Sequence, residues 1–192
     1  MKVKFYYICL AILTVFLAFS CARPPVAEMD SAREAVLRAE NDENAVLFGG
    51  TSLARARDAL RRMQVEADSK RFDAAKTHAQ EAIASAERAI AEGRMGASRA
   101  ESESEAIISG LAPAIEEAAR NINGARYSNL DLDYNQLNSD LNDARNSADS
   151  AIADHADGRY NEAIENGRRA RATVGNINER ITGAATLASA KK

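Results

Sequence analysis

The sequence predicts an all-α protein, an elongated helical bundle made of two tandem copies, and three observations predict it. The chain is rich in Ala and holds 3 Pro, 5 Tyr, 5 Phe and no Trp. Ala enters a helix without losing side-chain entropy, whereas strands prefer β-branched and aromatic residues. Apolar residues recur at alternating steps of three and four, which is the period of one helical face. The second half of the chain also repeats the first.

The net charge and the cysteine count exclude two classes of protein. A formal net charge of −3 argues against a general nucleic-acid binder, which needs a basic face to displace counterions from phosphates. The 2 cysteines of the chain, Cys9 and Cys21, are too few for a disulfide scaffold. We therefore expect no nucleic-acid partner and no disulfide framework.

Residues 1–20 have the pattern of an export signal. Two lysines precede an apolar run from Phe5 to Phe19, which is long enough for a signal core and shorter than the roughly 20 residues of a membrane span. Cys21 follows Ser20, and this arrangement resembles the signal of bacterial lipoproteins, although Ala18 stands where that family most often has Leu. The resemblance implies that Cys21 carries a diacylglycerol and becomes the first residue of the mature chain.

Ordinary secretory cleavage is the alternative, because Ala18 and Ser20 also satisfy the small-x-small rule and Cys21 would then be a free thiol. Lipidation is our prediction, since it explains why a cysteine stands at the cleavage site. Two or three acyl chains, at about 0.8 kcal/mol per buried methylene group, hold a protein on a membrane without spanning it. Residues 21–30 would comprise the lipidated cysteine and a spacer stiffened by Pro24 and Pro25. The expected location is the bacterial cell envelope, at a periplasmic face or the cell surface.

Three regular apolar stripes predict long helices. The first stripe begins at Phe72 and continues in small residues, which allow a partner helix to approach closely. Gly93 and Gly96 keep its step, which indicates a continuous helix and leaves a local hinge open. The stripes are Phe72, Ala75, Ala79, Ala82, Ala86, Ala89, Gly93, Gly96 and Ala100; Leu130, Tyr134, Leu137, Leu141, Ala144, Ala148 and Ala151; and Tyr160, Ala163, Gly167, Ala170, Val174, Ile177 and Ile181.

Capping and breaking residues divide the chain into about six helices. Ser31 with Glu34 has the spacing of a capping box at a helix start. The glycine pair at 49–50 interrupts the helical pattern, and Gly110 with Pro113 marks a further restart.

A shift of 88 positions superposes the two halves of the chain. If one gap is allowed, the match extends upstream to residues 35–48. We therefore expect copy one over residues 31–109, copy two over 110–182 and a flexible tail over 183–192. Two lobes joined by the long helix are a hypothesis that the duplication motivates, and a single bundle stays open. The matched pairs are Leu53 with Leu141, Ala56 with Ala144, Arg71 with Arg159, Phe72 with Tyr160 and Ala75 with Ala163, and upstream Ala35 with Ala114, Ala39 with Ala118 and Phe48 with Tyr127.

Two segments of copy one carry a family resemblance. The run from Phe48 to Leu53, with helical spacing on to Leu60, and the basic-aromatic turn Lys70–Phe72 resemble the repeat of Ala-rich bacterial lipoproteins known as domain of unknown function 4398. That resemblance implies an exported helical protein and brings no catalytic residue. The turn Gly158–Ala163 is also weakly similar to a tetratricopeptide hairpin, although the 88-residue period does not fit that family.

The histidine and acidic positions give little support for catalysis or metal binding. The only histidines are His78 and His155, and the 88-residue shift does not match them. We interpret His155 as a satisfied buried or capping histidine at the end of an apolar stripe. Asp131, Asp133 and Asn135 have the first spacings of a calcium loop, but the rest of that loop is lacking, so a helix N-terminus that collects acidic residues is the better interpretation. Alternating acidic residues at 101, 103 and 105 are interpreted as a solvated helix surface.

Basic and glycine-rich stretches have an ordinary structural interpretation as well. Arg55, Arg57, Arg61 and Arg62 form one stretch and Arg168, Arg169 and Arg171 another; they could touch anionic polymers, but pairing with neighbouring acidic residues is favoured. The run Gly49, Gly50 and Thr51 could cradle a phosphate, but a loop and helix cap is favoured. The terminal Lys192 is similar to the end of the murein-linked lipoprotein, and a frayed tail is the default.

The sequence thus predicts no catalytic, cofactor-binding or metal-ligating residue, and Cys21 is its single site residue, for lipid. We expect a membrane-anchored lipoprotein with a structural or protein-interaction role as scaffold or spacer, and no enzyme. The expected partners are the membrane, through the lipid at Cys21, and a protein. A peptidoglycan-tethering lipoprotein and a secreted helical ligand-binding module are the alternatives.

Overall fold

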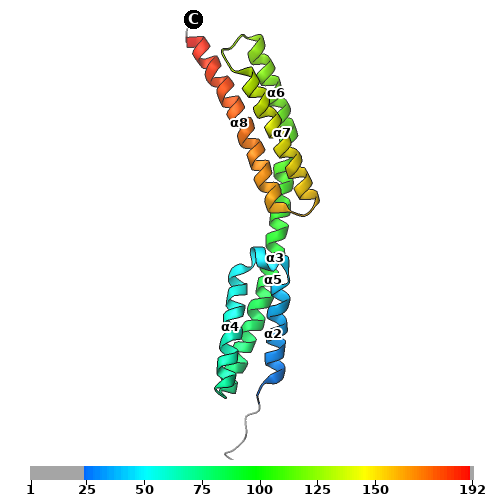
Figure 1. Ribbon diagram of the computed structural model, residues 1–192, viewed down its shortest axis with the longest axis vertical. Helices are drawn as coiled ribbons and strands as arrows, with labels where there is room; N and C mark the ends of the chain where they lie inside the picture. Colours follow the sequence, from blue (N-terminus) through cyan, green and yellow to red (C-terminus); the bar gives the residue numbers. More distant parts are fainter. Residues whose placement is uncertain (1–23, 191–192) are drawn as a thin grey trace, which may run out of the picture. The chain divides into compact units, whose positions relative to one another are not determined.

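The computed structural model describes residues 24–190, and within that range all regular secondary structure is helical, which confirms the predicted fold class. The predicted signal segment and Cys21 lie outside the described residues. None of the helices in the described range combines the length and hydrophobicity of a membrane span. The helices are α2 (Val26–Glu40), α3 (Glu43–Phe48), α4 (Gly50–Asp68), α5 (Phe72–Ser109), α6 (Leu111–Tyr127), α7 (Tyr134–Ala156) and α8 (Tyr160–Ala190) (Figure 1).

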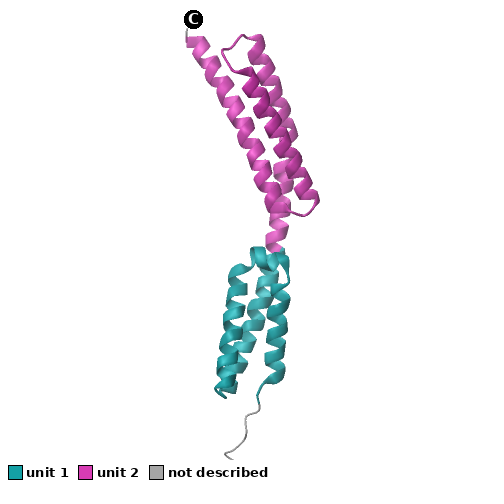
Figure 2. Ribbon diagram, in the orientation of Figure 1, with its two compact units in different colours: residues 1–94 teal, residues 95–192 magenta. Residues whose placement is uncertain are grey.

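The chain forms two compact units, Met1–Arg94 and Met95–Lys192, which Figure 2 distinguishes by colour. The division falls inside α5, whereas the sequence analysis divides the two copies at 109/110. The difference arises because the last turns of α5, with Ser104 and Ile107 buried, contribute side chains to the second unit.

Unit 1 packs α2, α3 and α4 against the first part of α5 around a core made mainly of Ala. The inward positions of α5 between Ala75 and Ala89 are all fully buried, as the first apolar stripe predicts. Because a methyl group is the largest side chain at those positions, neighbouring helices approach closely, and Met63 and Leu53 from α4 supply most of the bulk. The buried set is Met29, Ala32, Ala35, Val36, Ala39, Ala45, Leu53, Ala56, Ala59, Met63, Ala75, Ala79, Ala82, Ala86 and Ala89.

Two glycines let α3 lie directly against α5. A β-carbon at Gly49 would collide with the carbonyl oxygen of Ala89, and one at Gly93 would stand 2.5 Å from the backbone nitrogen of Ala45. The helix α5 continues without interruption through Gly93 from Phe72 to Ser109. Close packing therefore explains Gly93, for which the sequence had left a hinge open.

The helix α2 begins earlier than the sequence predicts. It starts at Val26 behind Pro25, whose carbonyl oxygen accepts a hydrogen bond of 3.0 Å from the Met29 amide, so the predicted start at Ser31 is wrong. Met29, in the added segment, is buried against the core, and the helix extends by more than one turn ahead of the Ser31–Glu34 pattern. The predicted spacer 21–30 is accordingly helical from Val26 onward.

Just before the glycine pair at which the sequence analysis expects an interruption, the structure has the short helix α3. Asp42 is its N-cap and accepts a hydrogen bond of 2.9 Å from the Ala45 amide. Gly49 ends α3 and precedes α4 directly. The connection between α2 and α4 is therefore a packed helical turn, held against α5 by its small residues.

Unit 2 packs α6, α7 and α8 with the last turns of α5. Its core has the same helical stripes but larger side chains, notably at Leu111, Ile122, Leu137 and Ile177. The helix α8 continues to Ala190, and after Ile181 every described side chain except Ala184 is exposed. Helix therefore covers most of residues 183–192, where the sequence analysis expects a frayed tail. The main cluster comprises Leu111, Ile115, Ala118, Ile122, Leu137, Leu141, Ala144, Ala148, Ala151, Ala170, Val174 and Ile177.

The turn from α4 to α5 and the turn from α7 to α8 have the same construction. In the first, the amide of Arg71 donates to the carbonyl of Glu66 at 2.9 Å, and in the second, the amide of Arg159 donates to the carbonyl of Asp154 at 2.8 Å. The residue before each arginine has positive φ, 58° at Lys70 and 78° at Gly158. Both arginines also form an ion pair with the acidic side chain five positions earlier. All these positions differ by 88.

Candidate functional site

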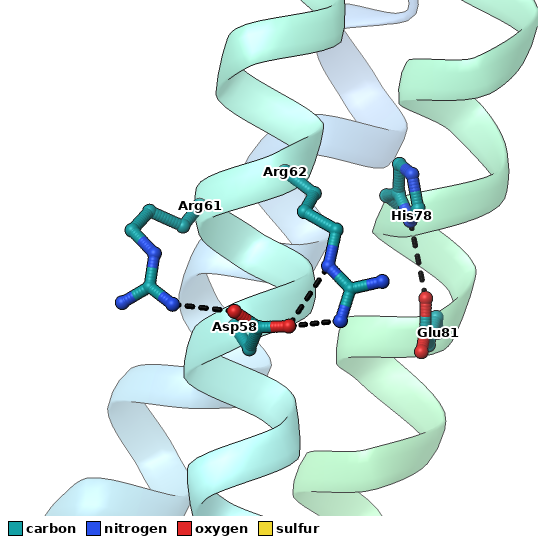
Figure 3. Close-up of polar contacts among 5 residues, drawn as sticks. All are labelled: Asp58, Arg61, Arg62, His78 and Glu81. Carbon is teal, nitrogen blue, oxygen red and sulfur yellow. Dashed lines mark hydrogen bonds and ion pairs between the residues drawn. The ribbon is translucent and has the colours of Figure 1, made fainter.

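The densest group of charged side chains in unit 1 lies where α4 faces α5 (Figure 3). Asp58 accepts hydrogen bonds from Arg62, whose Nε lies 2.8 Å from Oδ2, and from Arg61 one turn along the same helix. The Arg62 guanidinium, followed by that of Arg61, holds the pKa of the Asp58 carboxyl below its usual range. Asp58 is therefore an ionised pairing partner for two arginines and a poor proton donor near neutral pH.

His78 faces this group from α5 and already has a partner. Its Nδ1 lies 3.1 Å from Oε2 of Glu81 on the next turn of the same helix (Figure 3). Imidazole and carboxylate at this spacing form a common helix-surface pair. The sequence analysis did not single out Asp58 or Glu81. Asp58 stands four positions before Arg62 and Glu81 three positions after His78, and these helical spacings are the signal that predicts both pairs.

A hollow of about 530 Å³ adjoins this group and includes the candidate phosphate loop. Gly50 and Thr51 line it, whereas Gly49 faces the Ala89 carbonyl instead. Two arginines, at 55 and 62, and two carboxylates, at 58 and 81, share the same walls. Because the charges of the lining residues cancel, the hollow has no preference for an anion, and the glycine pair is explained by packing and by the start of α4.

The second histidine belongs to a cluster in unit 2. His155 Nδ1 lies 2.7 Å from the hydroxyl oxygen of Ser104, and its ring lies against that of Tyr160 with 5.4 Å between the centroids. The Ser104 hydroxyl donates to the Glu101 carbonyl at 2.7 Å, so it accepts the hydrogen bond from the Nδ1–H of His155. Ser104 is fully buried, and a hydroxyl held in this way is no nucleophile. The prediction that His155 is a satisfied histidine is confirmed.

Ser104 itself was missed by the sequence reasoning. It is in register with the apolar stripe of α5, between Ala100 and Ile107, which are both buried. A stripe extended past Ala100 would have placed this serine on the inward face. It fastens the last turns of α5 to the turn between α7 and α8.

The acidic candidates have structural roles. Asp133 is the N-cap of α7 and accepts a hydrogen bond of 3.0 Å from the Gln136 amide, as the helix-start interpretation predicts. Glu103 forms an ion pair of 2.6 Å with Arg168 of α8. Within residues 24–190, no three His, Cys, Asp or Glu side chains come together in a way that could hold a metal ion.

Most of the basic candidates pair inside their own unit, which agrees with the favoured interpretation. Arg57 Nε lies 2.7 Å from Glu40 Oε1 and ties α4 to α2. Arg171 of α8 donates to the carbonyls of Ala106 and Ile107 at 3.2 and 3.0 Å and caps the end of α5. This capping explains the break at Gly110, where a β-carbon would stand 2.9 Å from the Arg171 guanidinium.

Unit 2 also contains a surface groove between α6 and α7, which we call the α6–α7 groove. It has a volume of about 290 Å³, an apolar floor and three charged residues at its rim. Sequence reasoning missed it because Ile152 lies off the apolar stripe of α7, and 51 % of that side chain is exposed. The groove is lined by Ile108, Leu111, Ala112, Ile115, Glu116, Arg145, Ala148, Asp149 and Ile152.

Comparison with known proteins gives one result. Residues 27–104 match the family described as Domain of unknown function (DUF4398). No curated protein and no solved structure matches the chain. The matched segment contains α2, α3, α4 and α5 as far as Ser104, and it includes the glycine contacts and the basic-aromatic turn described above. The resemblance of the first copy to domain of unknown function 4398 is therefore confirmed over residues 27–104.

Proposed function

We propose that the protein is a lipoprotein of the bacterial cell envelope, anchored to a membrane by lipid at Cys21, with a non-catalytic role in binding or spacing other proteins. The signal-like segment before Cys21 supports the anchor, because a charged start, a short apolar core and a cysteine at the cleavage position occur together. The folded part begins close behind it, at Val26. Five residues reach at most about 18 Å, so unit 1 would stand near the lipid surface.

One observation carries the non-catalytic part of the proposal. Both histidines, the side chains best suited to acid–base work at neutral pH, are held by partners within the protein, His78 by Glu81 and His155 by Ser104. Across the described residues, moreover, every buried side-chain nitrogen or oxygen atom has a hydrogen-bond partner. Active sites commonly keep polar groups poised for a substrate, whereas here Glu81 holds His78 within α5 and Ser104 of α5 holds His155 of α7.

Exposed apolar side chains support an interaction role. Val46 and Leu47 on α3, Val65 on α4, and Ile152 on α7 are each at least half exposed. Helices that offer apolar side chains beside polar ones are typical docking surfaces for other helices. The scaffold hypothesis requires such surfaces to remain after the chain folds.

The test is the mass of the mature protein purified from its native membrane, compared with the Cys21→Ser variant. We expect an increment of acyl groups at residue 21 in the wild type, and none in the variant, which should leave the membrane fraction. Crosslinking of the anchored protein should then capture a protein partner. An unlipidated wild type, free in solution, would refute the anchor and leave a secreted helical module; retention in the cell-wall fraction after detergent extraction would favour a peptidoglycan tether.

A further inference from the structure

We propose that the α6–α7 groove binds a short amphipathic helix of a partner protein, one that presents aliphatic side chains about one turn apart and a lysine or arginine beside them. The proposal deepens the interaction role proposed above and does not depend on lipid at Cys21. Its starting point is a comparison of the two units. In unit 1, α2 packs beside the hairpin of α4 and α5, and in unit 2, α6 packs beside the hairpin of α7 and α8 (Figure 1).

Burial follows the same register in both units, which makes the comparison residue by residue. A shift of 79 brings the buried residues Ala32, Val36 and Ala39 of α2 onto the buried residues Leu111, Ile115 and Ala118 of α6. A shift of 88 brings Leu53 and Ala56 of α4 onto Leu141 and Ala144 of α7, which are also buried. The pair α2 and α4 in unit 1 thus corresponds to the pair α6 and α7 in unit 2.

In unit 1, long polar side chains cross the surface between these two helices. Arg33 of α2 donates to the Gln64 side chain of α4 at 2.8 Å and is held by Asp30 at 2.8 Å. About two turns further along, Arg57 of α4 forms an ion pair with Glu40 of α2. Arginine stems can cover apolar surface in this way while the guanidinium groups stay in water.

In unit 2, the corresponding residues form no such bridge. The counterparts of Arg33 and Gln64 are Ala112 and Ile152, and both line the α6–α7 groove. The counterpart of Glu40 is Ala119, so Arg145, the counterpart of Arg57, has no carboxylate at that place. The differences at Ala112 and Ile152 leave an apolar groove where the side chains of Arg33 and Gln64 meet in unit 1, and the difference at Ala119 removes the second bridge.

The shape and charge of the groove indicate what fills it. Leu111 and Ile115 of α6 lie about one turn apart, about 6 Å along the helix axis, and both line the groove. Its volume of about 290 Å³ is roughly twice that of a cavity that holds one benzene ring. It therefore accepts two aliphatic side chains from one face of a helix. Glu116 on one rim and Asp149 on the other are both exposed, and together they outnumber Arg145. A basic side chain on the partner would take the position that Arg33 holds in unit 1.

The test measures binding of a designed fluorescent peptide to the full-length chain in detergent. The peptide is an amphipathic helix with Leu at two positions one turn apart and Lys beside them, and a second peptide has Glu in place of Lys. The double variant Ala112→Arg and Ile152→Gln copies the closing residues of unit 1 onto unit 2. Both positions are exposed, and circular dichroism should show unchanged helix content and thermal transition. Leu37→Gln in unit 1 is the matched control for loss of an exposed apolar side chain.

We expect saturable binding of the Lys peptide by the wild type and by Leu37→Gln, and affinity at least tenfold lower for the closed variant and for the Glu peptide. Equal binding by the closed variant, equal binding of the two peptides, or no saturable binding by the wild type would overturn the proposal. The mass measurement at Cys21 distinguishes the two failures: an unlipidated chain that binds the peptide refutes the anchor alone, and a lipidated chain that does not bind refutes the groove alone.

Discussion

Gly93 of α5 lies against the backbone of Ala45 in α3, at a distance that leaves no room for a β-carbon between them. Two helices far apart in the sequence thus meet backbone to backbone, with Gly49 making the second such contact against Ala89. Glycine in the interior of a helix costs about 1 kcal/mol relative to alanine. The contact with α3 is the compensating interaction that explains this residue.

Gly93→Ala should loosen α3 from α5 even though alanine is the better helix former. Overpacking against backbone costs about 1–3 kcal/mol, which exceeds the gain in helix propensity, so amides of α3 should exchange faster in hydrogen-exchange mass spectrometry. Gly50→Ala is the control, because nothing lies within 4 Å of a β-carbon there, and it should leave the exchange of α3 unchanged or slower. Equal protection in the two variants would contradict the contact.

Lys70 and Gly158 occupy equivalent positions with positive φ, and only one of them is a glycine. A residue with a β-carbon in this left-handed conformation is strained by about 1 kcal/mol. Lys70→Gly should therefore raise the free energy of unfolding by up to about 1 kcal/mol, and Gly158→Ala should lower it by a similar amount. Urea titrations followed by circular dichroism at 222 nm measure both changes. A destabilised Lys70→Gly variant would show that the lysine side chain has a stabilising contact of its own.

The ion pairs of the two turns should make stability depend on pH in the acid range. Arg71 holds the pKa of the Glu66 carboxyl below its usual range, and Arg159, followed by the Asn166 side chain, lowers the pKa of Asp154. A carboxyl whose pKa is lower in the folded state binds fewer protons than in the unfolded state. Its contribution is thus complete above the unfolded pKa, about 4 for these residues, and is lost as the pH falls through the folded pKa.

Free energies of unfolding measured between pH 7 and pH 2 should therefore decline below about pH 4. The double variant Glu66→Gln and Asp154→Asn should be less stable at pH 7 and decline less steeply. Glu116→Gln is the control, since both side chains of its pair with Arg120 are more than two-thirds exposed and 3.8 Å apart. An unchanged slope in the double variant would mean that the turn pairs do not form in solution.

The sequence predicts the helices better than it predicts their ends. The stripe that begins at Phe72 matches the buried face of α5 residue for residue as far as Ala89, because burial on one helix face is a local, periodic property. The start of α2 at Val26 is missed because Met29 extends the helix through a contact with the core, which a capping pattern at Ser31 does not report. The packing role of Gly93 is not predicted for the same reason, as its partner Ala45 lies 48 positions away.

The features of the candidate site also differ in whether local sequence spacing determines them. Pairing of the basic stretches and the cap at Asp133 are predicted correctly, since their partners follow from charge and short spacing. The α6–α7 groove is not predicted, because it results from side chains that are small or absent: Ala112 and Ala119 stand where unit 1 has Arg33 and Glu40. Only the superposition of buried positions shows which bridges the second unit lacks.

Ser104 and His155 supply the last prediction. Ser104→Ala removes the acceptor of the His155 Nδ1–H and leaves a half-buried donor without a protein partner, which costs about 1 kcal/mol. Ser109→Ala is the matched control, because its hydroxyl is exposed and donates to its own helix at the Ala106 carbonyl. Thermal unfolding should show a lower midpoint for the first variant and no decrease for the second. Nitrogen NMR of the imidazole should show a proton on Nδ1 in the wild type and a shift toward the Nε2–H tautomer in Ser104→Ala. A wild-type ring with its proton on Nε2 would instead mean that Ser104 donates to His155 and that the Glu101 carbonyl has no share in the contact.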